Sequence, residues 1–405
     1  MSFLSTPGSI LFLISGFGII QGVLLAGLLY FHPKSDRSVT AFLALYIFCF
    51  SIPIIMPVGQ QLFSWQIIVF VEPFTLLIGP FLYLYVRSFK ETITFKKAWP
   101  HFILFFVYCI NAVYLYNAIA SKYPASTIVP EEVTRHPLTI VPVSVRILQR
   151  LAYYFFALKM LHKYQRSIRQ LFSETSRISL QWVKWLINGY LVIAVAVIIA
   201  YIMILNYPQY FSTWVLTLGS AATVYIYIAT FRGITQPSLW QVQPGIAKDK
   251  MEADMQKAQE IDAQATANKS LVPSKTILHD SKVKEIVEKI IYAMEEEKLY
   301  QEPELTLQNL ATRLGCPSYQ VSLAINEGMK KNFYDLINGY RVEEAKQLLL
   351  DEKNQNFTIL SVGFEAGFNS KTTFNTVFKK FTGLTPTEYR DKQRATSMVG
   401  HVTLI

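Results

Sequence analysis

The sequence predicts an all-α protein with three parts: a bundle of seven transmembrane helices (residues 1–235), a polar linker (236–276) and a helical domain with two helix-turn-helix motifs (277–405). Three observations support this division. Hydrophobic residues make up 52% of the chain and charged residues 16%, which is unlike an ordinary soluble protein. Long apolar segments fill the first part. A spacing of small and apolar residues that suits two crossing helices occurs twice in the last part.

Seven apolar segments have the length of about 20 residues that a helix needs to cross a bilayer. Tryptophans lie near several of their ends, where the ring prefers the membrane interface. The fifth segment contains arginines, so a re-entrant or cavity-lining segment is the alternative there. The segments are residues 8–31, 39–57, 65–87, 99–120, 139–161, 182–205 and 211–231.

The basic residues between the segments predict an orientation. With the amino terminus outside, the outer loops hold only Lys122 and Arg135. The inner loops then hold twelve: Lys34, Arg37, Arg87, Lys90, Lys96, Lys97, Lys159, Lys163, Arg166, Arg169, Arg177 and Lys184. Basic residues accumulate on the cytoplasmic side, so we expect a multi-pass protein of the inner (cytoplasmic) membrane whose carboxyl-terminal part lies in the cytoplasm.

The formal net charge of +10 does not by itself indicate nucleic-acid binding. Residues 1–240 hold 17 Lys and Arg against 6 Asp and Glu, residues 241–274 hold 4 against 5, and residues 275–405 hold 17 against 17. The excess therefore lies in the membrane part and follows its topology. Between the two parts, residues 236–276 are polar and rich in Ala and Gln, which predicts a linker that is partly helical over 248–267.

The last part begins with an amphipathic helix from Ser281, followed by the first motif, in which Thr306 can cap a helix. Ala311 is the small residue at the expected helix contact, and Gly315 permits the turn. Gly363 and Gly367 repeat this four-residue spacing in a second motif. Between the motifs, "YDLINGYRVEEAKQLLLDE" predicts a helix long enough to hold two recognition helices in successive major grooves.

Residues 305–390 resemble the DNA-binding domain of AraC-type transcription regulators, above all in "YRVEEAKQLL", "AGFNSKTTFNTVFKKFTG" and "TPTEYR". The upstream "GPFLYLYVRSF" and "WPHF" also resemble membrane-anchored members, although less specifically. The resemblance implies seven helices, two of which read promoter DNA, and binding by homodimers.

Carried over position by position, the first recognition helix starts at Pro317 and the second near Ser370. Their side chains are of types that pair with base edges or with phosphates. The implied DNA-binding residues are Ser318, Tyr319, Gln320 and Ser322 in the first helix, and Ser370, Lys371, Thr372, Asn375, Thr376, Lys379 and Lys380 in the second. For Lys379 and Lys380 a phosphate contact is the expectation.

The sequence departs from the family at three positions. Leu323 and Thr376 stand where a polar or basic residue is usual, and Gly363 replaces the more common alanine. For Tyr319 and Gln320, ordinary solvated surface is the alternative to base reading.

The motifs of common enzyme classes are absent, so we expect neither catalysis nor a cofactor. The three cysteines have no metal-ligand spacing, so no metal site is expected either. The sequence therefore predicts a sensor that couples a membrane or extracytoplasmic signal to promoter binding. The alternative is a membrane receptor or transporter whose helical tail binds protein instead of DNA.

Ionisable residues inside the apolar segments predict where sensing occurs, because such residues usually face partners or a cavity. Glu72 and Arg146 lie at similar depths, about 10 Å below the outer surface, and Arg150 lies one turn deeper. An ion pair is therefore geometrically possible. One hypothesis is that the pair lines an outward-facing pocket, where an anionic ligand competes with Glu72 for Arg146 and shifts the bundle between two packings. A purely structural pair, or arginines that reach the interface, are the alternatives.

Overall fold

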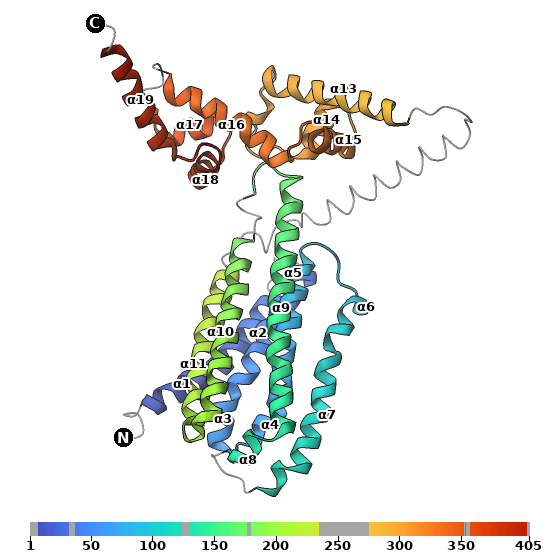
Figure 1. The fold of residues 1–405 in the computed structure, drawn as a ribbon, viewed down its shortest axis with the longest axis vertical. Helices are drawn as coiled ribbons and strands as arrows, with labels where there is room; N and C mark the ends of the chain where they lie inside the picture. The colour runs from blue at the N-terminus through green and yellow to red at the C-terminus, as the bar shows by residue number, and fades with distance from the viewer. Residues whose placement is uncertain are drawn as a thin grey trace, which may run out of the picture. The chain divides into compact units, whose positions relative to one another are not determined.

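A computed structural model gives the fold of residues 7–31, 37–123, 129–175, 180–234, 275–351, 353 and 357–402 (Figure 1). In these ranges the secondary structure is helical, apart from one isolated antiparallel bridge between Phe172 and Thr306. The predicted all-α class is confirmed. By its contacts the chain divides into two units, Met1–Tyr164 with Leu180–Gln243, and Gln165–Ser179 with Pro244–Ile405.

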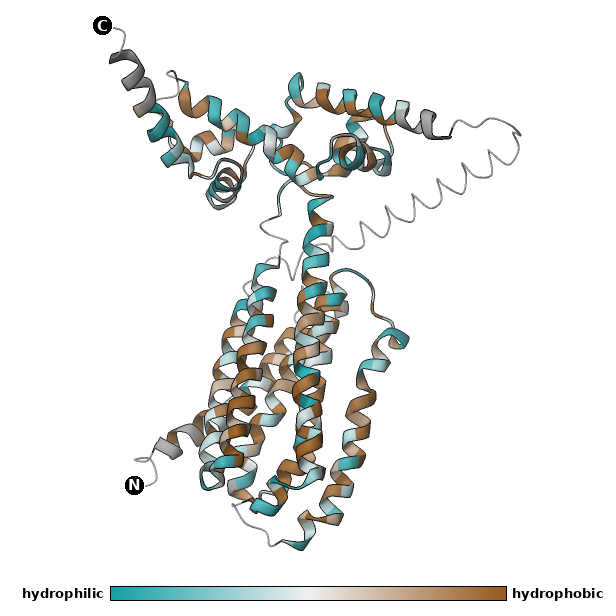
Figure 2. Ribbon diagram, viewed as in Figure 1, coloured by the Kyte–Doolittle hydropathy of each residue, from teal (hydrophilic) through white to brown (hydrophobic). Residues whose placement is uncertain are grey.

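The first unit is a bundle of apolar helices, coloured blue to yellow-green in Figure 1. Hydrophobic residues follow these helices along their length (Figure 2). The helices are α1 (Pro7–Phe31), α2 (Arg37–Ser51), α3 (Ile55–Leu62), α4 (Ile67–Val71), α5 (Thr75–Ser88), α6 (Phe95–Ala98), α7 (Ile103–Ala118), α8 (Glu131–Thr134), α9 (Pro137–Arg169), α10 (Gln181–Asn206) and α11 (Phe211–Ile234).

Prolines divide two of the predicted segments into shorter pieces, and a third segment begins with a proline-containing turn. Short 3₁₀ turns contain Pro53, Pro73 and Pro100, each at the first or second position of its turn. Proline has no amide hydrogen to donate and fixes its own φ, so a tight turn replaces a regular α-helical turn there. The turn around Pro73 also contains Glu72, so this charged residue lies at an irregular point of the third segment.

Six of the seven predicted segments are helices long and apolar enough to cross a membrane. They are Phe12–Phe31, Val39–Gln60, Ile67–Ser88, Phe95–Lys122, Gln181–Asn206 and Phe211–Arg232. The fifth segment, in α9, does not reach the same hydropathy, and arginines and lysines along α9 are the reason. The count of seven spans stays a prediction.

Helix α9 nevertheless follows the third segment closely. Its Arg146 contacts Glu72, and its Gln149 donates to the carbonyl of Leu76 at 3.0 Å. That carbonyl lacks its usual helical partner because Pro80, four residues later, has no amide hydrogen. Further along, Tyr164 packs on Phe89 with ring centroids 6.0 Å apart. The third segment and α9 therefore run side by side in the same direction, from the Glu72–Arg146 contact to the Phe89–Tyr164 contact.

A glycine allows this close approach. A Cβ atom on Gly79 would lie 2.9 to 3.0 Å from side-chain atoms of Tyr153 on α9, which is closer than real Cβ contacts. Glycine is therefore the residue that lets α5 and α9 touch. The contact keeps the turn that carries Glu72 next to the arginines of α9.

The second unit contains α13 (Lys275–Glu295), α14 (Leu307–Leu314), α15 (Ser318–Leu323), α16 (Phe333–Leu350), α17 (Ile359–Glu365), α18 (Lys371–Thr382) and α19 (Pro386–Val402). Helix α13 begins six residues before the predicted start at Ser281. The apolar residues form two cores, one around α13 to α15 and one around α17 and α18, and α16 contributes to both. The last two residues of the expected linker, Lys275 and Thr276, begin α13, and the rest of it, with the helix predicted over 248–267, lies outside the described residues.

Candidate nucleic-acid interface and membrane cavity

The first helix-turn-helix motif consists of α14 and α15. The hydroxyl of Thr306 accepts a hydrogen bond from the amide of Asn309 at 3.1 Å, which is the cap expected from the sequence. Gly315 ends α14 with a φ of 63°, a backbone conformation that glycine adopts without strain. Most of the apolar face is fully buried, at Leu307, Leu310, Ala311, Val321, Ala324 and Ile325, whereas Leu314 is half-buried.

The second motif repeats this construction in α17 and α18. Ser370 caps α18 by accepting from the amide of Thr373 at 3.1 Å, and Gly367 forms the turn with a φ of 92°. Gly363 stands where the family usually has alanine, and its neighbour explains the difference. A Cβ atom on Gly363 would lie 2.7 Å from the ring of Phe374, which fills the space between the two helices.

Helix α18 has one buried face and one exposed face. Thr373, Phe374, Val377 and Phe378 are buried. The predicted DNA-binding residues lie on the other face: Lys371, Thr372, Thr376, Lys379 and Lys380 are exposed, and Ser370 and Asn375 are half-buried. The helix therefore presents polar side chains on the side away from the core, which is the side a recognition helix turns toward a major groove.

The predicted residues of α15 are all half-buried and bond to their neighbours. Ser318 donates to Gln308 at 2.6 Å, and the Gln320 amide donates to the hydroxyl of Tyr319 at 3.0 Å. Ser322 accepts from Asn326 at 3.3 Å. These short-range bonds leave α15 with a smaller outward surface than α18.

Lys380 has partners within the domain. Its Nζ lies 2.6 Å from Oδ1 of Asp335 on α16, and it also lies over the rings of Tyr334 and Phe381. Asp335 is itself held by Asn332, which caps α16. The two neighbouring lysines that the sequence assigned to phosphates therefore have different surroundings.

Sequence reasoning missed a buried polar cluster around Arg341 of α16. Its guanidinium donates to the carbonyls of Tyr300 and Glu302, both at 2.7 Å, and lies over the ring of Phe368. Burial lowers the pKa of Arg341 to about 10. Asn338, one turn earlier, is also fully buried. The only sequence signal was a polar pair on the inward face of a predicted helix.

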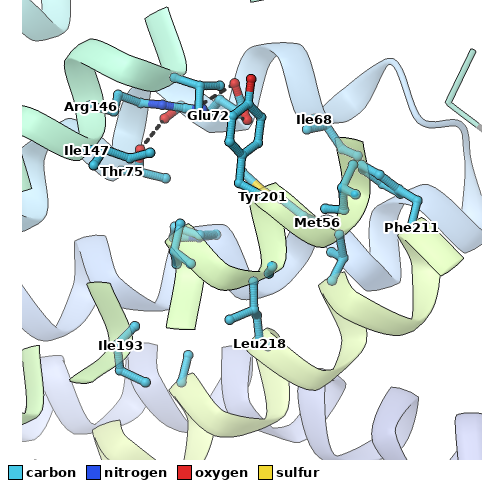
Figure 3. Close-up of a pocket in the computed structure, with 18 of the residues that line it drawn as sticks. Met56, Ile68, Glu72, Thr75, Arg146, Ile147, Ile193, Tyr201, Phe211 and Leu218 are labelled. Carbon is cyan, nitrogen blue, oxygen red and sulfur yellow. Dashed lines mark hydrogen bonds and ion pairs between the residues drawn. The ribbon is translucent and has the colours of Figure 1, made fainter. Parts of the chain in front are cut away.

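The first unit contains a cavity of about 250 Å³ between its helices. Figure 3 shows the Glu72–Arg146 pair at one side and apolar side chains from α3, α4, α10 and α11 around the rest. Two contacts join the pair, Arg146 Nη1 to Glu72 Oε2 at 2.7 Å and Arg146 Nη2 to Glu72 Oε1 at 3.0 Å. The ion pair expected from the sequence is therefore present, and Arg150 lines the same cavity.

Comparisons with known proteins agree with the geometry of the second unit. Residues 310–392 match the family described as a helix-turn-helix domain. Uncharacterized HTH-type transcriptional regulators of Staphylococcus aureus strains COL, MSSA476 and N315 are each 30% identical over 122 residues. The match covers 30% of this chain and 15% of each relative, so the chain spans a small part of their length. No solved structure matches.

The paired motifs and this match define the class of the second unit, a helix-turn-helix domain. More narrowly, it is an AraC-type domain, with two motifs joined by one long helix. The chain joins this domain to a region of apolar helices fit to cross a membrane.

Proposed function

We propose that the chain is a membrane-embedded transcription regulator that binds promoter DNA in a sequence-specific manner and responds to a signal received by its membrane part. The observation that carries the proposal is the presence of both features in one chain, a helix-turn-helix domain of a regulator family and six apolar helices of membrane-spanning length. A regulator needs no catalytic step, because binding free energy alone can shift the domain between states.

The exposed face of α18 supports base reading by the second motif. Lys371 and Asn375 are types that pair with guanine and adenine, and Lys379 suits a phosphate. In this proposal α15 makes fewer base contacts and serves mainly to orient the domain, because Ser318 already bonds to Gln308 on α14 and Gln320 bonds to Tyr319. As in the family it resembles, the regulator would bind as a homodimer.

The path of α9 supports seven spans and a cytoplasmic domain. Its contacts follow the third segment from Glu72 to Phe89, which is 17 residues (89 minus 72) or roughly 26 Å of helix. That length is close to the bilayer core of about 30 Å. A helix that accompanies a span over this distance crosses the membrane with it. Its Arg146 and Arg150 face the cavity, and its Gln149 bonds to the third segment.

A selection experiment with the intact protein tests DNA binding. The full chain in lipid nanodiscs is mixed with random duplex DNA, and the bound fraction is sequenced. We expect one enriched motif, and we expect the double variant Lys371→Ala, Thr376→Ala to lose the enrichment, since both side chains are exposed and neither supports the core. Enrichment of no motif would favour the alternative, a receptor or transporter whose tail binds protein.

A further inference from the structure

The membrane cavity has an unbalanced charge. Glu72 and Arg146 neutralise each other through their two contacts, and they leave Arg150, one helical turn further along α9, as a second positive charge on the cavity wall. The guanidinium of Arg150 makes no hydrogen bond or ion pair with any residue that the structure describes. An uncompensated charge at membrane depth is costly, so this arrangement favours an anion beside Arg150.

Two tyrosine hydroxyls on the same cavity wall also lack partners in the described part of the chain. They belong to Tyr190, whose side chain is 2% exposed, and to Tyr201. Buried hydroxyls are nearly always hydrogen-bonded, because an unpaired one loses its hydration without replacement. The Tyr190 hydroxyl can donate to an oxygen of an anionic group that sits next to Arg150, whereas Tyr201 lies beside the Glu72–Arg146 pair (Figure 3).

Most of the remaining surface of the cavity is apolar. It includes Ile68, Val143, Ile193, Val197, Phe211 and Leu218. An inorganic anion would leave this surface without contacts, and a hydrocarbon would leave Arg150 without a counter-ion. The complementary ligand therefore combines one anionic group with an apolar chain.

We propose that the cavity binds a singly charged anionic amphiphile, with its head group against Arg150 and its chain on the apolar wall. This inference rests on the proposed function, because it names the chemistry of the signal that the regulator receives. It also changes the expectation from the sequence: the ligand pairs with Arg150, while the Glu72–Arg146 pair stays closed.

Tryptophan quenching in the full chain tests the proposal. Trp65 lines the cavity and is 1% exposed, so a ligand with a bromine at the end of its chain quenches it only when bound nearby. The probes are a brominated medium-chain carboxylate and the brominated alcohol of the same length, added to protein in phosphatidylcholine nanodiscs. The Trp65→Phe variant defines the signal from the other tryptophans.

We expect saturable quenching by the carboxylate, at least about tenfold weaker binding of the alcohol, and a similar loss in Arg150→Gln. Arg150→Lys retains the charge and should bind within a few-fold of the unmodified protein. If phosphatidylglycerol in the nanodisc competes with the probe, a membrane lipid supplies the anionic head; if it does not, a free carboxylate does. Both results support the proposal.

Equal quenching by carboxylate and alcohol, or unchanged binding in Arg150→Gln, would overturn it. Tyr190→Phe provides a milder variant if Arg150→Gln does not accumulate, and we expect a smaller loss of carboxylate binding there. Motif selection with the same nanodiscs separates the two proposals. If the protein still selects a DNA motif but does not bind the carboxylate, the proposed amphiphile site is wrong and the proposed regulator function stands.

A second, independent observation concerns residues 171–174, which follow α9 and belong to the second unit. The amide of Leu307 donates to the carbonyl of Leu171 at 2.9 Å, and the amide of Ser173 donates to the carbonyl of Leu305 at 3.3 Å. The side chain of Leu171 is part of the core around α13 to α15. A short stretch of the chain before α10 therefore completes the first helix-turn-helix motif.

The same stretch reaches the helix that joins the motifs. The carbonyl of Ser173 accepts a hydrogen bond from the side-chain amide of Asn338 at 2.9 Å. The hydroxyl of Ser173 donates to the carbonyl of Leu305 at 2.6 Å. All three of Ser173, Asn338 and Arg341 are fully buried, and Arg341 lies 3.4 Å from the Ser173 hydroxyl. The buried polar groups of α16 thus find partners in a segment more than 160 residues earlier in the chain.

Glu174 extends the contact to the second motif, where the hydroxyl of Thr373 donates to its carboxylate at 3.4 Å. Thr373 is buried, whereas its neighbours Thr372 and Thr376 on α18 are exposed. The segment therefore touches both motifs without covering the surface proposed to meet DNA. We infer that residues 171–174 act as a brace that fixes the two recognition helices relative to each other, attached directly to the helix that carries Arg146 and Arg150.

Hydrogen exchange and DNA binding of the intact chain in nanodiscs test the brace. In the unmodified protein the amides of Ser173 and Leu307 should be protected. Leu171→Asp should raise their exchange at least about tenfold and weaken DNA binding by about tenfold, while Leu171→Met and the exposed Arg166→Gln should change neither.

Absent protection of these amides in the unmodified protein would overturn the brace. So would unchanged or tighter DNA binding by Leu171→Asp, because a brace can only favour the binding geometry. Ser173→Ala removes the two hydrogen bonds of the hydroxyl, to Leu305 and from Arg341, without adding a charge. It replaces Leu171→Asp as the test if that variant does not accumulate. We expect faster exchange at Leu307 and weaker DNA binding in that variant as well.

Discussion

The two neighbouring lysines at the end of α18 provide a sharp test of the DNA-facing surface. Both lysines are exposed. Only Lys380, whose side chain is 48% exposed, is described with an ion pair, to Asp335 at 2.6 Å, and with contacts to two aromatic rings. We expect Lys379→Ala to remove one phosphate contact and Lys380→Ala to remove none. The sequence alone assigned both lysines to phosphates.

The expected magnitudes follow from counter-ion release. Each phosphate contact contributes about 0.9 to the slope of log K against log salt concentration. Between about 50 and 200 mM salt the affinity of the unmodified protein should thus fall about 3.5-fold more than that of Lys379→Ala. Lys380→Ala should keep the slope and instead lower the stability of the domain by about 1 kcal/mol, from a surface ion pair and cation–π contacts.

Fluorescence anisotropy of labelled promoter DNA, titrated with the intact chain in nanodiscs over a salt series, measures both slopes. Asp335→Asn is the matched control, because it releases Lys380 and should raise the slope by up to about 0.9. A lower slope in Lys380→Ala, together with no change in Asp335→Asn, would refute this reasoning. In that case Lys380 would leave Asp335 and contact a phosphate.

Three further outcomes are expected. After Arg232, a reporter enzyme that works only in the cytoplasm should be active, and near Ser126, one that works only in the periplasm should be active. The reverse pattern would overturn the topology. Lys371→Ala and Asn375→Ala should change which bases are selected, and selection of an unchanged motif by both would show that α18 does not read sequence. Gly363→Ala should destabilise the second unit by about 1 to 3 kcal/mol, measured by thermal unfolding, because the added methyl group would lie 2.7 Å from a phenylalanine ring. An unaffected melting temperature would mean that this ring moves aside without cost.

Much of the fold could be predicted because its signals are local. The apolar segments, the caps at Thr306 and Ser370 and the turns at Gly315 and Gly367 each depend on a few adjacent residues, and the structure has them as expected. Proline explains most of the irregularity inside the segments, since it removes a hydrogen-bond donor wherever it occurs.

The features that sequence reasoning missed depend on residues far apart in the chain. Nothing near Ser173 indicates that it would meet Asn338 and Arg341, because a loop segment has no periodic pattern to interpret. Lys380 and Asp335 are likewise 45 residues apart. The Glu72–Arg146 pair was accessible because membrane depth restricts where a charge can find a partner.

The central claim is that an intact, membrane-embedded chain binds promoter DNA, and a genome-wide footprint of the full-length protein in its own cells tests it most directly. The account predicts discrete sites that share one motif, recovered with the membrane fraction and lost in the double variant Lys371→Ala, Thr376→Ala. Footprints that appear only with a fragment released from the membrane, or no sites above background, would contradict it.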